Sequence, residues 1–402
     1  MTGRPQLWVG IDVGKSSHHA CATDTDGKTV FSEKIANDQA AIEALITRAR
    51  QAGDNICWAI DLTSSAAALL ISILTIAEQH VVYVPGRVVH RMTGAFRGEA
   101  KSDAKDARVI AETARMRDDL TVLGADDSLI TELARLTSHR ADLTTDWTRG
   151  LNRLRDLLLS IFPGLEAAFD YTNRSPLILL TGYQTPAAIR DAGVEDLTSY
   201  LREHRAWPSK VASIAAAAVS AARAQTVQLP GEAVTAELIA AQAGRMLDLQ
   251  RQIQQVDKIM HARFRTHSQA EIIESLPGMG PTLGAEFLVA VGGSVDAFVT
   301  PGRLASYAGL VPVSRDSGRI QGNLRRPKRY NRRLRRVFYM AALCSLKAGG
   351  ASRAFYDRKR DERQVHKQAV LALARRLVDV LWALLRDGRM FTADPPLAAS
   401  AA

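Results

Sequence analysis

The sequence is poor in cysteine and has no long apolar run. Its three cysteines, Cys21, Cys57 and Cys344, lie far apart, and none forms a Cys-x-x-Cys pair or a cluster with histidine. A zinc site and a disulfide framework are therefore not expected, and free thiols are typical of a cytoplasmic protein. No stretch approaches the roughly 20 apolar residues of a membrane-spanning helix, and the N-terminus lacks a signal-peptide pattern. We therefore expect a cytoplasmic protein with no membrane partner.

Acidic residues are in the minority. The chain has 52 Lys and Arg against 42 Asp and Glu, a formal net charge of +10. Such a balance favours a polyanionic partner such as nucleic acid, although a merely soluble basic enzyme would also fit. With 402 residues, of which 47% are hydrophobic, the chain has room for two or three domains, each with its own core.

The N-terminal region alternates between short apolar runs and amphipathic segments. Residues 8–15 are typical of a buried strand with Asp12 near its end and Gly14 just beyond. The predicted strands that follow span residues 20–23, 29–35, 56–61 and 81–84, and the predicted helices span 39–52 and 64–79. The order βββαβαβ is that of an RNase H-like fold, in which the first and fourth strands are neighbours. Asp12 and Asp61 should therefore lie side by side.

Two further carboxylates open the next helix, after a basic connector predicted over residues 90–98. Asp103 and Asp106 are spaced i,i+3, so they share one helix face. Acidic residues in a first turn can simply cap a helix and complement its dipole. Together with Asp12 and Asp61, however, they complete a set of four oxygen ligands.

The centre of the chain is helical. Residues 128–161 predict one long amphipathic helix, with Arg140 interrupting an otherwise apolar stripe, and residues 246–260 carry a second stripe. The stripes consist of Leu136, Leu143, Trp147, Leu151, Leu154, Leu158 and Ile161, and of Met246, Leu249, Ile253, Val256 and Met260. We expect the two helices to pair as an antiparallel coiled coil or bundle and to contribute to an oligomer interface.

The C-terminal region combines a Pro-Gly turn with a dense basic run. Residues 276–281, Leu-Pro-Gly-Met-Gly-Pro, resemble the turn of a helix-hairpin-helix motif, whose backbone N–H groups can hold a DNA phosphate. From Arg319 to Arg336 there are nine basic residues and no acidic one. A run of this density predicts phosphate binding rather than only a solvated face. The candidate nucleic-acid contacts are Arg315, Arg319, Arg325, Arg326, Lys328, Arg329, Arg332 and Arg333.

These motifs together resemble the DEDD-type transposases of the insertion-sequence-110 family, which are bridge-RNA-guided recombinases. The N-terminal motifs are Gly-Ile-Asp-Val-Gly-Lys at 10–15, Ala-Ile-Asp at 59–61 and Lys-Ser-Asp-Ala-Lys-Asp-Ala at 101–107. The C-terminal motifs are the Pro-Gly turn, Tyr-Ala-Gly-Leu-Val-Pro at 307–312, Ser-Gly at 317–318 and the arginine-rich run. One position departs from the family pattern, because Asp61 stands where the family often has Glu.

The resemblance implies a fold and a division into domains. It implies an α/β RNase H-like (RuvC-like) domain over residues 1–120, a helical coiled-coil segment over 121–268 and a mainly α transposase domain over 269–390, with a tail over 391–402. It also implies a bacterial protein that is associated with the nucleoid.

The resemblance further implies the chemistry. The enzyme would cleave, exchange and rejoin DNA strands of a mobile element, with a structured guide RNA and a homo-oligomer, a dimer or tetramer, as partners. Asp12, Asp61, Asp103 and Asp106 would bind Mg²⁺, or Mn²⁺, because hard oxygen ligands suit these ions. By motif the nucleophile falls on Ser317, with Ser314 as the alternative.

Three other functions stay open at this point. A Holliday-junction-type metal-dependent nuclease would use the carboxylates but no serine. An actin-like sugar kinase or ATPase would share the opening strand, but a second Asp-x-Gly-Gly phosphate loop is not evident in the sequence. A non-enzymatic DNA- or RNA-binding protein would tolerate the loss of the aspartates.

Overall fold

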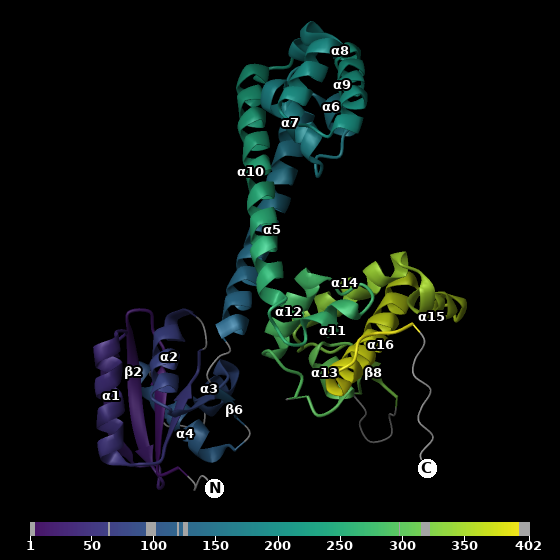
Figure 1. Ribbon diagram of the computed structural model, residues 1–402. Coiled ribbons are helices and arrows are strands. Elements are labelled where there is room, and N and C mark those ends of the chain that lie inside the picture. Colours follow the sequence, from purple (N-terminus) through teal and green to yellow (C-terminus); the bar gives the residue numbers. More distant parts are fainter. Residues whose placement is uncertain are drawn as a thin grey trace. The chain divides into compact units, whose positions relative to one another are not determined.

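The computed structural model describes residues 5–62, 65–93, 102–118, 120–123, 128–296, 298–314 and 322–393. The chain divides into two compact units, Met1–Asp127 and Ser128–Ala402, and each is considered by itself. Figure 1 shows the chain coloured along the sequence and labels many of its helices and some of its strands.

The first unit is built on a six-stranded mixed sheet. Its strands are β1 (Leu7–Asp12), β2 (Ser17–Asp24), β3 (Thr29–Ala36), β4 (Ile56–Ile60), β5 (His80–Tyr83) and β6 (Thr121–Leu123), in the spatial order β3-β2-β1-β4-β5-β6. β1 pairs antiparallel with β2 and parallel with β4, with Ile11 opposite Ile60. The adjacency of the first and fourth strands, predicted for an RNase H-like fold, is confirmed.

Helices cover both faces of this sheet. On one face, apolar residues of α1 (Gln39–Ala52) and α2 (Ala68–Ile76) pack against alternate residues of β1, among them Val9 and Ile11. On the other face, α3 (Gly86–Thr93) and α4 (Asp103–Met116) cover Trp8 and the facing residues of β4 and β5. The sequence did not predict β6, and it predicted a connector over 90–98, whereas residues 86–93 form α3.

Gly10 of β1 is a point of close approach between the sheet and α4. A Cβ atom there would lie less than 3.0 Å from the carbonyl oxygen of Ala107 and from the backbone nitrogen and Cα of Ala111. At the other end of β1, a Cβ at Gly27 would lie near the side chains of Glu112 and Arg115, later on α4. The helix therefore runs antiparallel to β1, and its first turn lies toward the end of β1 that carries Asp12.

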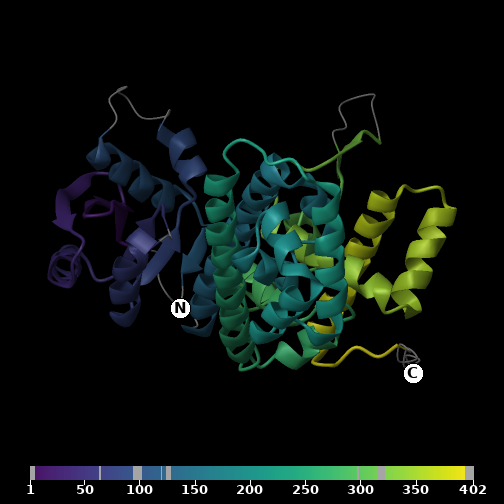
Figure 2. The same cartoon turned by 90° about the horizontal axis from the view of Figure 1, so that it is seen from above.

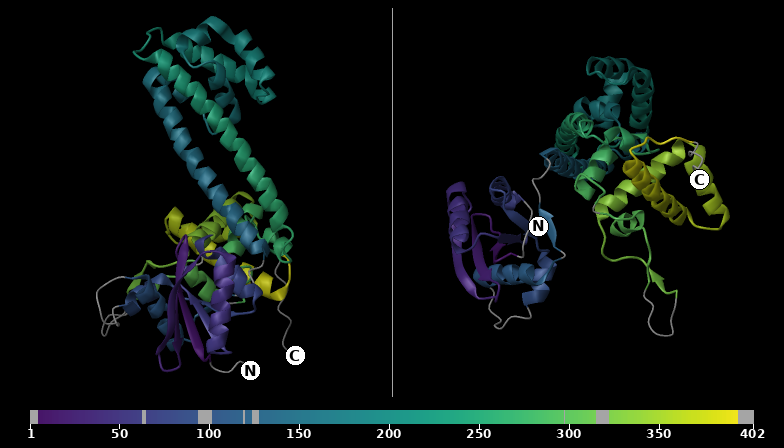
Figure 3. Two further views of the ribbon diagram at one scale, coloured as in Figure 1. Left: turned by 90° about the vertical axis from the view of Figure 1, so that its left-hand side faces the viewer. Right: turned by 60° about the horizontal axis from the view of Figure 1, so that its bottom comes forward.

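The second unit begins with two long antiparallel helices. α5 (Ser128–Ile161) matches its predicted bounds, and α10 (Glu232–Phe264) contains the second stripe. Arg140, which the sequence showed as an interruption, forms an ion pair with Asp257, and Glu132 pairs with Arg263. These partners confirm the antiparallel pairing, and the left view of Figure 3 shows the two helices lying side by side.

Between the two long helices the chain forms a small helical bundle. Its elements are α6 (Pro163–Ala168), α7 (Arg174–Gly182), α8 (Pro186–Glu203), the short 3₁₀ helix Pro208–Lys210 and α9 (Val211–Ala224). Its buried core includes Phe162, Tyr171 and Ile189, together with Leu158 of α5 and Met246 of α10. The bundle thus joins the ends of the two long helices into one folded region.

The C-terminal part of this unit is mainly helical. It contains α11 (Ala270–Ser275), α12 (Pro281–Val291), α13 (Pro301–Tyr307), β7 (Val313–Ser314), β8 (Leu324–Arg325), α14 (Arg332–Lys347), α15 (Gly350–Asp361) and α16 (His366–Asp387). Its core is large and includes Phe264, Phe287 and Phe338. The short strands β7 and β8 pair antiparallel and extend away from these helices (Figure 2). Within the described residues, no helix is both long and apolar enough to cross a membrane.

Replacing Gly10 with alanine tests the contact between β1 and α4. The added Cβ would meet backbone atoms of Ala107 and Ala111, which cannot rotate away. Overpacking of this kind typically costs about 1–3 kcal/mol, so we expect Gly10→Ala to destabilise the first unit by at least that much. Hydrogen–deuterium exchange of residues 7–24 in denaturant would measure the change. Gly53→Ala is the matched control, because its Cβ would have 3.7 Å of clearance from Leu7. An equal effect of the two variants would contradict the role given to this contact.

Candidate active site

Two of the four predicted carboxylates end neighbouring parallel strands. Ile11 is opposite Ile60 in the register of β1 and β4, so the next residues, Asp12 and Asp61, follow at the same edge of the sheet. Strand residues alternate between faces. Asp12 therefore shares the face of Trp8, and Asp61 shares the face of Cys57 and Ala59, which is the face covered by α4.

The other two carboxylates lie on the first turn of α4. Asp103 precedes the buried Ala107 by four residues, and Asp106 precedes the buried Ile110 by four, so both belong to the stripe that faces the sheet. Asp103 is exposed and Asp106 is half-buried. The helix is capped by Ser102, whose hydroxyl accepts a hydrogen bond from the Lys105 N–H at 3.3 Å. Capping therefore does not account for Asp103 and Asp106.

Asp61 is strongly affected by burial. Its Oδ1 is buried and accepts no hydrogen bond. Burial raises the pKa of Asp61, and the nearby charge of Asp106 raises it further, while the backbone N–H groups of Val13 and of Asp61 itself offset this only in part. Asp61 and Asp106 are thus close enough to interact electrostatically. The site concentrates negative charge that is incompletely solvated.

A divalent cation suits this donor set, because Mg²⁺ and Mn²⁺ prefer hard carboxylate oxygens. The orphaned Oδ1 of Asp61 is an available ligand. Among the described residues, however, no three acidic, histidine or cysteine side chains converge closely enough to hold a metal ion as they stand. The structure gathers the predicted residues at one edge without closing them around a common point.

The predicted nucleophile, Ser317, and its neighbours Arg315 and Arg319 lie outside the described residues. The alternative, Ser314, lies on β7 opposite Leu324 and is exposed. All of these positions belong to the second unit, whereas the carboxylates belong to the first.

The basic run divides into two groups. Arg335 and Arg336 are engaged within the protein: Arg335 donates to the carbonyl oxygen of Gly309 at 3.2 Å, and Arg336 forms an ion pair with Glu286. The second group is exposed, and it forms no ion pair with any carboxylate that the structure describes. Its members are Arg325, Arg326, Lys328, Arg329, Arg332 and Arg333.

The position of two of these arginines is unfavourable for the helix itself. Arg332 and Arg333 open α14, although cations are destabilising at a helix N-terminus. Asn331 caps the helix by accepting the Leu334 N–H at 3.0 Å. This arrangement leaves several uncompensated cations together on one surface.

The predicted turn between two helices is present, between α11 and α12. A Cβ at Gly278 would lie less than 3.0 Å from backbone atoms of Ala341 and Ser345 on α14. Close packing on α14 therefore explains this glycine without a phosphate.

The sequence analysis did not single out Tyr330, which stands inside the basic run and contacts two of its arginines. An aromatic residue within a cationic segment was the available signal.

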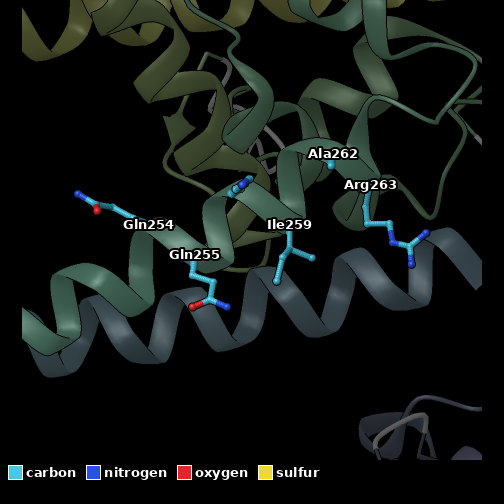
Figure 4. A pocket seen from close by; sticks show the side chains of 6 residues that line it. Gln254, Gln255, Ile259, Ala262 and Arg263 are labelled. Carbon is cyan, nitrogen blue, oxygen red and sulfur yellow. The ribbon is translucent and has the colours of Figure 1, made fainter.

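Two hollows on the second unit are lined by none of the candidate site residues. One, of about 600 Å³, follows α10 and is lined by Gln254, Gln255, Lys258, Ile259, Ala262 and Arg263 (Figure 4). All of its lining comes from a single helix, so no chemical groups converge on it from different elements. The other, of about 610 Å³, lies between α15 and α16 and has a largely apolar lining that includes Phe355 and Leu373.

Comparison with known proteins identifies similar sequences. A family model described as a transposase, of the DEDD type of IS110, matches residues 9–163, and one described as a transposase of the IS116/IS110/IS902 family matches residues 270–357. An uncharacterized 44.8 kDa protein of insertion element IS116 from Streptomyces clavuligerus is 51% identical over 100% of both chains. An uncharacterized 42 kDa protein of IS900 from Mycobacterium paratuberculosis is 47% identical over 96% of this chain and 97% of its own. An uncharacterized 43.6 kDa protein of IS110 from Streptomyces coelicolor is 32% identical over 97% of this chain and 96% of its own.

The raised pKa of Asp61 predicts a pH dependence of stability. The folded protein holds this proton more tightly than the unfolded chain, so the free energy of unfolding falls as pH rises from the ordinary Asp value of 3.8 through the raised pKa. Asp61→Asn removes this loss. We expect the stability of the variant relative to wild type to grow across that window and then stay constant.

Thermal unfolding in chelator between about pH 4 and pH 8 would measure this difference. Asp54→Asn, at an exposed position of the same unit, is the matched control. A difference between Asp61→Asn and wild type that does not change with pH would contradict the assigned burial of the carboxylate.

Proposed function

The chain belongs to the IS116/IS110/IS902 family of transposases, enzymes that catalyse DNA strand transfer, and from this we propose that it cleaves, exchanges and rejoins the strands of a mobile element with a carboxylate-bound metal and a serine nucleophile. The observation that supports this most strongly is the common edge of Asp12, Asp61 and the first turn of α4. Asp103 and Asp106 also complement the dipole of α4, but this does not account for Asp61, whose buried Oδ1 has no hydrogen-bond partner.

Asp12, Asp61, Asp103 and Asp106 would hold one or two Mg²⁺ ions. When bound, such ions stabilise negative charge on a reacting phosphate and lower the proton affinity of a coordinated oxygen. The role of the chain's own residues is to fix the ligands: two by strand ends, two by a helix packed against those strands. Binding would also relieve the unfavourable burial of ionised Asp61, because it supplies the missing partner of Oδ1.

Ser317 is proposed as the nucleophile. Its Oγ would form a bond to a DNA phosphorus while the bond from that phosphorus to the leaving strand's oxygen breaks, and the hydroxyl proton would pass to a nearby base or to solvent. A covalent protein–DNA link keeps the phosphodiester energy, so strands can be rejoined without ATP. The exposed cations nearby in sequence, Arg325 and Arg326 among them, would neutralise phosphate charge.

The proposed partners are nucleic acids and further copies of the chain. DNA is the substrate, and the proposed guide RNA is a second polyanion that the net charge of +10 suits. The carboxylates and Ser317 belong to different units, so a homo-oligomer that combines sites from several copies would be suitable. We also propose the division into a RuvC-like domain, a helical segment containing the α5 and α10 pair as a coiled coil, and a transposase domain.

Removing one carboxylate tests the metal site. Loss of a partner in the outer shell of a metal site typically costs 10–100-fold, so losing a ligand in Asp106→Asn should lower strand cleavage by about 100-fold or more. Cleavage of labelled element DNA in Mg²⁺ or Mn²⁺, and its loss in excess chelator, are the measurements. Asp54→Asn should cleave like wild type. Full activity of Asp106→Asn, or cleavage in chelator, would exclude this mechanism.

A denaturing gel tests the serine. Wild type on labelled DNA should form a covalent protein–DNA adduct, and Ser317→Ala should not, because the nucleophilic oxygen is gone. Ser314→Ala should keep the adduct. If Ser314→Ala loses it instead, the nucleophile is Ser314. If both variants still recombine DNA, serine catalysis is refuted. The alternative is then a Holliday-junction-type nuclease, which needs only the carboxylates.

A further inference from the structure

Tyr330 is held in place from two sides. A Cβ at Gly309 would lie 2.7 Å from the Cβ of Tyr330 and 2.8 Å from its Cδ2, so only glycine lets the tyrosine side chain approach this backbone. Gly309 also has φ of +68°, a conformation that favours glycine. The guanidinium of Arg335 lies 5.0 Å from the centre of the ring and donates to the carbonyl oxygen of Gly309. The ring therefore lies against Gly309 and Arg335, which are themselves joined.

The residue that follows Tyr330 fixes the backbone as well. The Asn331 N–H donates to the carbonyl oxygen of Tyr307 at 2.8 Å, and its side-chain amide donates to the Tyr307 hydroxyl at 3.1 Å. Tyr307 in turn packs on Phe298, with ring centres 5.3 Å apart. The backbone next to Tyr330 is thus fixed by hydrogen bonds to the end of α13, immediately before α14 begins.

The phenol oxygen of Tyr330 points to the basic run. It accepts a hydrogen bond from Nη2 of Arg326 at 3.1 Å. An arginine side chain has five N–H donors in a planar fork, so this contact leaves others available. Arg326 is exposed, and no ion pair between it and a described carboxylate competes for it. The hydrogen bond from Arg326, followed by the charges of Arg326, Arg335 and Arg332, lowers the pKa of Tyr330.

We propose that Tyr330 is a positioning residue that presents Arg326 to a nucleic-acid phosphate. This inference rests on the proposed nucleic-acid role of the basic run. A long arginine on an exposed segment loses much conformational freedom when it binds a phosphate, and a prior hydrogen bond to a fixed phenol reduces that loss. Tyr330 acts on the DNA through Arg326 and need not touch it.

A double-mutant cycle tests the coupling. The full-length variants Tyr330→Phe, Arg326→Ala and the double variant are titrated with a labelled DNA duplex of random sequence across a range of salt concentrations. Arg326→Ala should reduce the log–log salt slope by about 0.9, the contribution of one phosphate. Tyr330→Phe should weaken binding in the wild-type background and have no further effect in the Arg326→Ala background.

Two controls separate positioning from folding. Tyr330→Phe keeps the ring against Gly309, so its thermal unfolding should match that of wild type. In strand cleavage it should raise the half-saturating DNA concentration and leave the plateau rate unchanged. Tyr339→Phe, the same deletion on α14 outside the basic run, should change neither binding nor cleavage.

The outcomes distinguish this inference from the function on which it rests. If Arg326→Ala weakens binding and Tyr330→Phe does not, or if the two effects are additive, the positioning role is refuted while the nucleic-acid surface stands. If Arg326→Ala binds DNA like wild type, the proposed surface itself fails at this residue, and the positioning role fails with it.

Discussion

The contact between β1 and α4 at Gly10 is the constraint on which the carboxylate edge depends. Strand pairing alone brings Asp12 beside Asp61, but Asp103 and Asp106 arrive only because α4 can lie directly on the backbone of β1. A side chain at Gly10 would push the helix outward and carry both carboxylates with it. The position of the site thus follows from the absence of a single Cβ atom. Gly10 is two residues from Asp12, so the same strand supplies a proposed metal ligand and the space that lets α4 bring Asp103 and Asp106 close.

The long helices of the second unit depend on a different kind of contact. Arg140 and Asp257 pair between α5 and α10, with side chains 21% and 24% exposed. Both side chains are part-buried, so the cost of removing two charges from water offsets much of their attraction. The ion pair does disfavour shifts of one helix along the other, since a shift would place either charge against the apolar stripe. The apolar residues of the stripe supply the stability of the pair, and Arg140 and Asp257 restrict its register.

Periodicity predicted the parts of this protein that are governed by burial. Alternation and apolar runs gave β1 to β5 in the correct order, and the amphipathic pattern gave α5 with its bounds. The short edge strand β6 was missed because three residues on the edge of a sheet carry almost no pattern. Arg140 was taken for an interruption because its partner lies 117 residues away. Long-range contacts of this kind cannot be derived from local spacing.

The candidate site was predictable to a similar extent. The four carboxylates could be placed at one edge because sheet topology places strand ends and i,i+3 spacing places a helix face, while their role as metal ligands stays a prediction. The tyrosine that contacts Arg326 was not found, because Gly309 and Tyr330 are brought together only by the packing of α13 against the rest of the unit. The Pro-Gly turn was given a phosphate-binding interpretation, yet the backbone of α14 lies where a side chain on Gly278 would have to go.

The start of α14 shows that the basic surface is maintained against local preference. Arg332 and Arg333 oppose the helix dipole, so they cost stability where they stand. The helix is stabilised by other means: the cap from Asn331, and buried apolar residues such as Val337 and Phe338 in the core. Arg335 and Arg336 belong to the same sequence run but are satisfied within the protein. Two cations of the run are satisfied within the protein and six are exposed without a described carboxylate partner, and an external anion would compensate these six. In the proposed function, the DNA phosphates would supply the missing negative charge at the start of α14.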